Sequence, residues 1–177
     1  MIEGKGFVLR AVRSSDLEEL FELVRREELL KSVHSEPKFQ QKFNNTGFWE
    51  ETEGAVLILK KKRIAGLIEY HQATPFEGLA LTFCVFKEQD RSVGLMSAAL
   101  SLFSLSLFEM KKIERLQLFI PDYNKAAIRV AQKCLFQFEG IARRALFHRG
   151  AFRDLCLYAL LRREVEKIPI HPESSPA

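Results

Sequence analysis

The order of apolar and polar residues along the chain predicts a series of short strands and helices. Some segments alternate apolar with polar side chains or form short apolar runs, as β-strands do. They are residues 7–12, 55–60, 63–73, 78–86, 115–120, 136–147 and 152–161. Others have apolar residues at helical spacing; they are residues 14–27, 94–110 and 124–134. This order predicts a mixed α/β (α+β) domain with one sheet and helices on its faces.

Two parts of the chain lack such a pattern. In residues 30–54, Phe39 and Phe43 could share one face of a short helix, but Pro37, NNTG and Gly54 interrupt it. We therefore expect irregular structure there, suited to a substrate-facing insertion. Residues 166–177 form a tail rich in proline and serine, which we expect to be disordered. A chain of 177 residues is short enough for one core, so we expect residues 1–165 to form a single domain.

Charge and composition narrow the function classes. The 27 basic and 23 acidic residues give a net charge of +4, spread along the chain. This excess suits a small anionic ligand, whereas a nucleic-acid interface needs a concentrated basic face. No apolar run reaches the roughly 18 residues of a membrane span, so we expect a cytoplasmic protein. The fifteen phenylalanines leave room for an apolar dimer contact, so a monomer and a homodimer both fit.

The spacing of cysteine and histidine indicates neither a disulfide framework nor a metal site. The three cysteines are far apart, and the four histidines lack the spacing of metal ligands. We therefore expect reduced and mostly buried thiols, and no bound metal.

Several short segments together resemble the GNAT acetyltransferase superfamily, in its branch of Rim-type ribosomal-protein N-acetyltransferases. LRAVRSSDLEEL is similar to that branch's opening strand and helix, PDYNKAAIRVAQK to its fifth-strand exit and following helix, and FEGIARRALFHRGAFRDLCLYALL to its closing hairpin. The resemblance implies a GNAT fold, in which a mostly antiparallel sheet separates between the strands at 78–86 and 115–120 and carries helices on both faces. It also implies acetyl-CoA as the co-substrate.

The resemblance assigns the stretch DRSVGLM (90–96) to the superfamily's pyrophosphate loop, Q/R-x-x-G-x-G/A. Arg91 and Gly94 occupy its first two signature positions, and Met96 stands where a second glycine or alanine is expected. Successive N–H groups at a helix start can bind diphosphate oxygens, provided that no Cβ atom blocks the approach. The implied cofactor loop consists of Arg91, Ser92, Val93, Gly94, Leu95 and Met96.

Two further parts of the chain are implied to bind the cofactor. Asn124 is expected to contact the pantetheine arm, and it also suits the N-cap of the helix that follows. The strand at 78–86 is expected to pair with the same arm through its backbone, and its N–H groups would polarise the thioester carbonyl as an oxyanion hole. These strand residues are Phe83, Cys84, Val85 and Phe86.

The implied reaction is direct attack of a primary amine on the thioester. A base must remove a proton, because the pKa of an α-amino group is about 8 and that of a lysine-type amine about 10.4. Glu69 and His71 lie two residues apart on one strand and so share a face; either is a candidate base, and an exposed polar strand end is the alternative. The family's serine and tyrosine acid positions hold Ala127 and Ala131, which leaves Tyr123 as a substitute donor.

These departures leave two functions open. The first is an N-acetyltransferase acting on a protein N-terminus or a small amine, such as a polyamine or an aminoglycoside. The second, motivated by the two alanines and by Met96, is a GNAT-fold module that binds CoA or a partner with weak catalysis.

A further departure is Leu135, in the glycine position of the family's K-L-G-F helix end, which implies a different helix end or a strain of roughly 1 kcal/mol.

Overall fold

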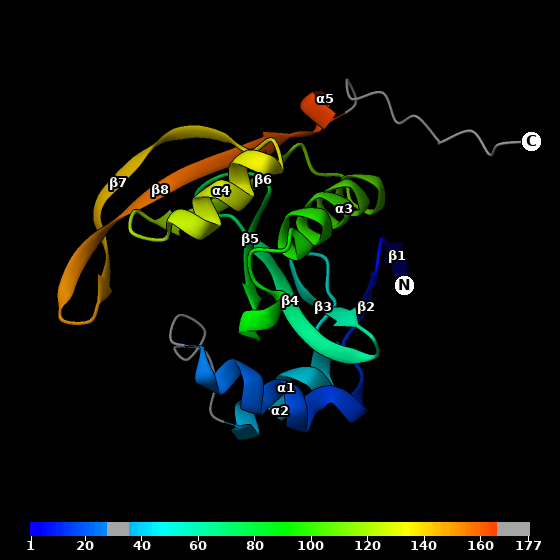
Figure 1. Cartoon of the computed structure of the whole chain (residues 1–177). Coiled ribbons are helices and arrows are strands. Elements are labelled where there is room, and N and C mark those ends of the chain that lie inside the picture. Colours follow the sequence, from blue (N-terminus) through cyan, green and yellow to red (C-terminus); the bar gives the residue numbers. More distant parts are fainter. Residues whose placement is uncertain (28–35, 166–177) are drawn as a thin grey trace, which may run out of the picture.

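One twisted sheet forms the centre of the protein (Figure 1). The computed structural model describes residues 1–27 and 36–165. The sheet has eight strands in the order β1-β2-β3-β4-β5-β6-β8-β7. They are β1 (Ile2–Gly4), β2 (Phe7–Ala11), β3 (Glu53–Lys60), β4 (Arg63–Gln72), β5 (Leu79–Val85), β6 (Arg115–Pro121), β7 (Gln137–His148) and β8 (Ala151–Leu161). All neighbouring strands are antiparallel except β5 and β6, which confirms the predicted mixed and mostly antiparallel sheet.

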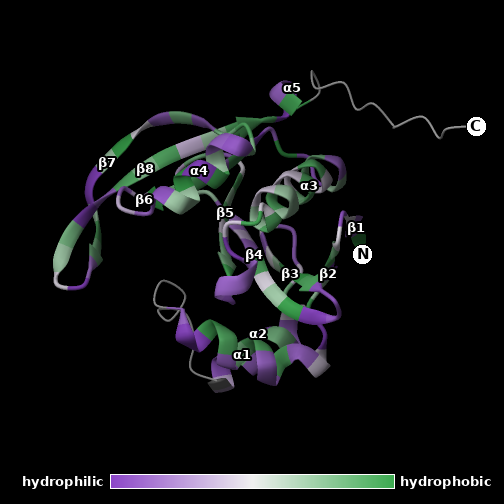
Figure 2. Ribbon diagram, viewed as in Figure 1, coloured by the Kyte–Doolittle hydropathy of each residue, from purple (hydrophilic) through white to green (hydrophobic). Residues whose placement is uncertain are grey.

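Helices cover both faces of the sheet, as the GNAT resemblance implies. One face packs against α1 (Leu17–Arg26) and α2 (Glu36–Thr46), and the other against α3 (Leu95–Met110) and α4 (Lys125–Lys133). A last short helix, α5 (Arg162–Val165), follows β8, and 3-10 turns precede α1 (Ser14–Asp16) and α3 (Glu88–Asp90). In Figure 2, α1 and α2 carry both hydrophobic and hydrophilic residues, as expected of helices with one side against a sheet.

The sheet opens between β5 and β6. These parallel strands pair only at Leu79 with Leu116 and at Ala80 with Gln117, and further along they separate. The backbone of β5 after Ala80 therefore lacks a neighbouring strand on that side. The implied separation between the strands at 78–86 and 115–120 is confirmed, and it creates the space for the site.

The expectation of irregular structure throughout 30–54 is wrong for residues 36–46, which form α2. Pro37 lies in the first turn, where its missing N–H is not needed for the helix. Phe39 is buried and packs at 5.0 Å between ring centroids on Phe48, so tertiary packing stabilises this short helix. Of the rest of the predicted irregular segment, residues 47–52 lie outside the helices and strands and residues 53–54 begin β3. Residues 30–35 and the tail at 166–177 lie outside the described residues.

The backbone at the end of α4 is strained at Leu135, which is one of the two outcomes expected from the sequence. Leu135 has a φ of 66°, in the left-handed region that favours glycine. The N–H of Phe136 donates to Ala131 O at 3.0 Å, and that of Leu135 to Gln132 O at 3.1 Å. The helix thus ends in a left-handed cap that ordinarily uses glycine, with a leucine in its place.

Other expectations concern the thiols and the membrane. Cys134 and Cys156 are buried, Cys84 is partly buried, and all three are free thiols. Within residues 1–27 and 36–165, no helix is both long and apolar enough to cross a membrane.

Candidate active site

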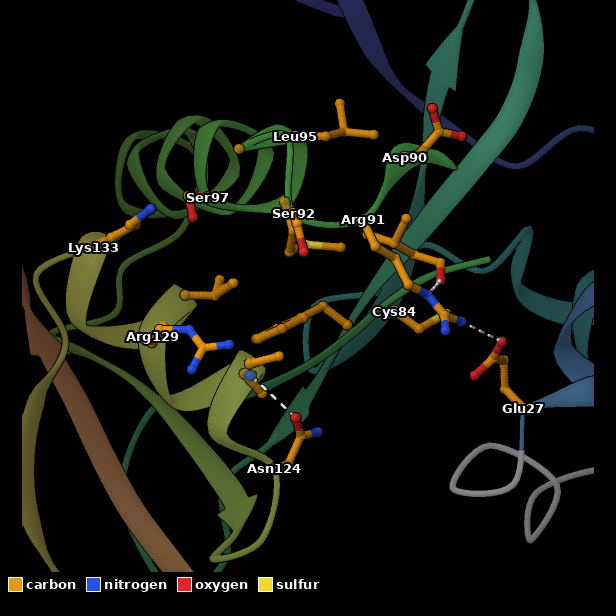
Figure 3. A pocket seen from close by; sticks show the side chains of 17 residues that line it. Glu27, Cys84, Asp90, Arg91, Ser92, Leu95, Ser97, Asn124, Arg129 and Lys133 are labelled. Atoms are coloured by element: carbon orange, nitrogen blue, oxygen red, sulfur yellow. Dashed lines mark hydrogen bonds and ion pairs between the residues drawn. The ribbon is translucent and has the colours of Figure 1, made fainter. Parts of the chain in front are cut away.

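A cavity of about 500 Å³ lies where β5 and β6 separate (Figure 3). From β5 it is lined by Phe83, Cys84 and Val85. From the following loop and the start of α3 it is lined by Arg91, Ser92, Gly94, Leu95 and Met96, and from the start of α4 by Asn124. The fold thus brings together most of the residues that the sequence assigned to the cofactor. Phe86 and Val93 are outside the cavity lining found for the described residues.

The loop before α3 presents backbone amides to this cavity. The first hydrogen bond of α3 runs from the N–H of Ala98 to Gly94 O at 3.0 Å, so the amides before it lack an intrahelical partner. Gly94 has a φ of 80°, and a Cβ built there meets nothing within 4 Å. Ser92 is also left-handed, at 61°. Met96 is buried and packs in the core cluster, and it also lines the cavity.

The backbone of β5 faces the gap at alternate residues. The N–H of Phe86 donates to Ala65 O of β4 at 3.0 Å. Because neighbouring residues of a strand direct their backbone groups to opposite sides, the groups of Phe83 and Val85 turn toward the gap. Val85 O accepts a hydrogen bond from Arg91 Nε at 3.1 Å, in agreement with this direction. The amides of Phe83 and Val85 are thus open to a ligand, and that of Phe86 is not.

Both carboxylates on the cavity wall face cations. Glu27 lies 3.5 Å from Arg91 Nη2. Asp90 is buried, and its two oxygens lie 3.2 Å from Lys60 Nζ and 2.6 Å from Arg63 Nη2. Burial alone would raise the pKa of Asp90, but the hydrogen bonds from Arg63 and Lys60 hold this pKa below its usual value. These contacts also join the loop before α3 to the turn between β3 and β4.

Two cations on α4 also line the cavity, and the sequence reading did not identify them. Arg129 and Lys133 stand four residues apart, so they share a side of the helix. Their i, i+4 spacing was visible in the sequence, but the same spacing is common on solvated helix surfaces.

The start of α4 carries the predicted asparagine. Asn124 Oδ1 accepts the N–H of Ala127 at 3.1 Å and so caps the helix, while its side chain also lines the cavity. Ala127 lines the cavity as well, whereas Ala131 is fully buried in the core. The position that would hold the Rim-type serine therefore faces the site, and the tyrosine position does not.

A second cavity, of about 270 Å³, contains both candidate bases. Glu69 and His71 line it together with Thr82, on the face of the sheet that carries α1 and α2. Glu69 pairs with Thr82 across β4 and β5, and Cys84, which lines the first cavity, lies two residues further along β5. Both cavities therefore reach the same face of β5, because residues two apart on a strand share a face.

Burial shifts the pKa values of the two candidate bases in opposite directions. Burial raises the pKa of Glu69, and the nearby Lys42 offsets only part of this effect. For His71, burial lowers the pKa, and the negative charge of Glu53 opposes the change. Lys42 and Glu53 form an ion pair of 2.7 Å in the same cavity.

Tyr123 lies away from these residues. Its ring stacks on that of His148, with centroids 5.6 Å apart, and the guanidinium of Arg153 lies 5.9 Å from the ring centre. The tyrosine thus contacts the β7–β8 hairpin, and it is outside the lining of either cavity found among the described residues. Among residues 1–27 and 36–165, no group of three or more His, Cys, Asp or Glu side chains could hold a metal ion.

Solved structures share this fold. RimL, a ribosomal-protein alpha-N-acetyltransferase in complex with coenzyme A, is 19% identical, covers 89% of this chain and 95% of its own, and has a TM-score of 0.77. A spermidine N-acetyltransferase from Vibrio cholerae, in complex with CoA and spermine, is 16% identical over 89% and 96%, also with a TM-score of 0.77. RimJ from Mycobacterium smegmatis, in complex with a CoA-disulfide, is 17% identical over 90% and 83%, with a TM-score of 0.73. At these identities the likeness shows the fold alone.

The family is identified by sequence. A comparison with curated proteins found no match. The model of the acetyltransferase (GNAT) domain, however, matches residues 7–137, which is most of the chain. The chain therefore belongs to the GNAT family of acyl-CoA-dependent N-acetyltransferases.

Proposed function

We propose that the protein transfers the acetyl group of acetyl-CoA to a primary amine, on a protein N-terminus or a small molecule, by direct attack on the thioester. We assign this activity to residues 1–165 as one domain. The proposal rests mainly on one observation: the gap between β5 and β6 and the unpartnered amides before α3 open into one cavity.

The described residues fit acetyl-CoA in charge and shape. The amides of Ser92 to Met96 can bind a diphosphate, and the bare backbone at Gly94 leaves it room to approach. The amides of Phe83 and Val85 can pair with the pantetheine arm and polarise the thioester carbonyl. When bound, acetyl-CoA supplies the activated acyl group, and the side chain of Asn124 is a further polar contact along this path.

Glu69 is the better candidate for the general base. A base works best when its pKa lies near the working pH, and burial raises the pKa of Glu69 toward this range. The bound ammonium first loses one proton to the carboxylate, directly or through water, and the carboxylate passes this proton on to solvent. The neutral amine nitrogen then forms a bond to the carbonyl carbon, its second proton passes to the carboxylate by the same route, and the carbon–sulfur bond breaks. The departing thiolate of a thiol with a pKa of about 8.5 can take its proton from water, so a side-chain acid is not essential.

The second cavity is the proposed acceptor site. Its volume of about 270 Å³ suits a small amine or the first residue of a peptide. Both carboxylates there, Glu53 and Glu69, favour a cationic group, and Lys42 balances one of them. This balance fits a single ammonium group, which both kinds of acceptor provide.

The experiment measures the release of CoA thiol with a panel of N-terminal peptides and polyamines. For an accepted amine, Glu69→Gln should lower kcat by about 100-fold or more, the usual contribution of a general base. His71→Asn, in the same cavity, should change kcat by less than a few-fold. The opposite ranking would assign the base to His71. Binding of acetyl-CoA without turnover of any acceptor would favour a CoA-binding module.

A further inference from the structure

Arg129 and Lys133 have no role in the proposed amine transfer. Both are exposed residues of α4 and line the first cavity near Ser97 of α3 (Figure 3). Within residues 1–27 and 36–165, neither has an ion pair or a side-chain hydrogen bond. Two cations thus face a ligand cavity without a counter-charge from the described protein.

The other charges of the cavity wall are compensated. Glu27 faces Arg91, and Asp90 is held by Lys60 and Arg63. In Figure 3, Arg91 and Glu27 lie on one side of Ser92, and the two cations of α4 lie on the other. The uncompensated positive charge is therefore gathered on the α4 side, apart from the part of the cavity formed by β5.

A structural role explains only one of the two. Lys133 is in the last turn of α4, where a cation is favoured by the helix dipole. Arg129 lies in the middle of the helix, where the dipole gives no such preference. The shared feature of the two residues is the cavity that they face.

We propose that Arg129 and Lys133 form a phosphate-monoester subsite, which binds the 3′-phosphate of coenzyme A separately from the amides that take its diphosphate. This inference rests on the proposed function. A phosphate monoester carries a charge of about −1.5 to −2 at pH 7, so it needs cations of its own. A guanidinium can donate two parallel hydrogen bonds to it, and an ammonium adds a point charge.

The test compares two ligands that differ only in this phosphate. The dissociation constants of coenzyme A and of 3′-dephospho-CoA are measured by calorimetry for the unaltered protein and for the double variant Arg129→Gln/Lys133→Gln. The unaltered protein should prefer coenzyme A by roughly tenfold or more, and the double variant should lose this preference while binding 3′-dephospho-CoA unchanged. Lys112→Gln removes the same kind of charge from an exposed residue beyond the far end of α3 and should keep the preference.

The possible results separate the subsite from the function. Equal affinity of the unaltered protein for both ligands would overturn the subsite and leave the proposed function in place. The same would follow if the double variant lost affinity for both ligands alike, or kept its preference for coenzyme A. If the unaltered protein bound neither ligand, the proposed function would fail, and the subsite with it. Melting temperatures and the two single variants establish that a lost preference does not come from unfolding.

Discussion

Gly94 provides the sharpest test of the amide cradle. Its φ is 80°, a Cβ built there meets no other atom within 4 Å, and the residue lines the cavity, so a substituted side chain has space to start toward the ligand. Gly94→Glu places a carboxylate beside the proposed diphosphate site, and Gly94→Gln places the same bulk there without charge. Both variants bear the same left-handed strain, of roughly 1–2 kcal/mol. The difference between them therefore measures the charge alone.

The size of that difference follows from Coulomb's law. For a carboxylate about 7 Å from one phosphate charge, at an effective dielectric constant of about 20, the repulsion is about 2 kcal/mol. This corresponds to an affinity for acetyl-CoA about thirtyfold weaker for Glu than for Gln. The dissociation constants are measured by calorimetry at low salt, and the ratio should shrink as salt is added.

A control for the strain is available in the same chain. Gly150, in the β7–β8 turn, has a φ of 75° and equally open space, but it does not line the first cavity. Gly150→Glu should cost similar stability and leave the affinity for acetyl-CoA unchanged. If Gly94→Glu and Gly94→Gln weakened binding equally, or if neither did, Gly94 would not be part of an anion site.

Three further predictions concern the reaction and the fold. A general base must be ionised, so kcat/KM should fall as the pH falls through the pKa of Glu69, which burial raises above the ~4.3 of an exposed glutamate. In Glu69→Gln this dependence should disappear, and only the pH dependence that comes from ionisation of the acceptor amine should remain. Ala127→Ser adds a hydroxyl to the cavity and should raise kcat several-fold with an unchanged KM for acetyl-CoA; an unchanged kcat in steady-state assays would show that thiolate protonation does not limit the rate. Lys111 is buried and donates to two backbone carbonyls at 2.9 and 3.0 Å, so Lys111→Met should lower the unfolding free energy by about 2–4 kcal/mol in urea titrations. The exposed Lys112→Met should be nearly neutral there, and equal losses would refute the role of these bonds.

Much of the fold could be predicted from local patterns. The predicted strands and three of the helices recur in the structure because each has the periodicity of its own element. Helix α2 was missed because Pro37 and a short apolar pattern indicate a break. Its stability comes from Phe39 and Phe43 packing on Phe48, which lies outside the helix.

The site divides in the same way. The loop at 91–96 and Asn124 could be found because they belong to short motifs with a local geometry. Arg129 and Lys133 could not, because their sequence spacing is that of any solvated helix. They acquire a possible ligand only through the cavity that the separation of β5 and β6 opens beside α4.

By itself, the sequence determined the order of most elements, the glycine-bearing loop before α3, and the residue types that could serve as base. These features depend on neighbours within a few positions. Only the tertiary structure decided that Glu69 is half-buried in one cavity with His71, that Tyr123 turns to the hairpin, and that Ala127 faces the cavity while Ala131 is in the core. Burial and distance arise from contacts between segments far apart in the chain, and these contacts set pKa values and bring reacting groups together.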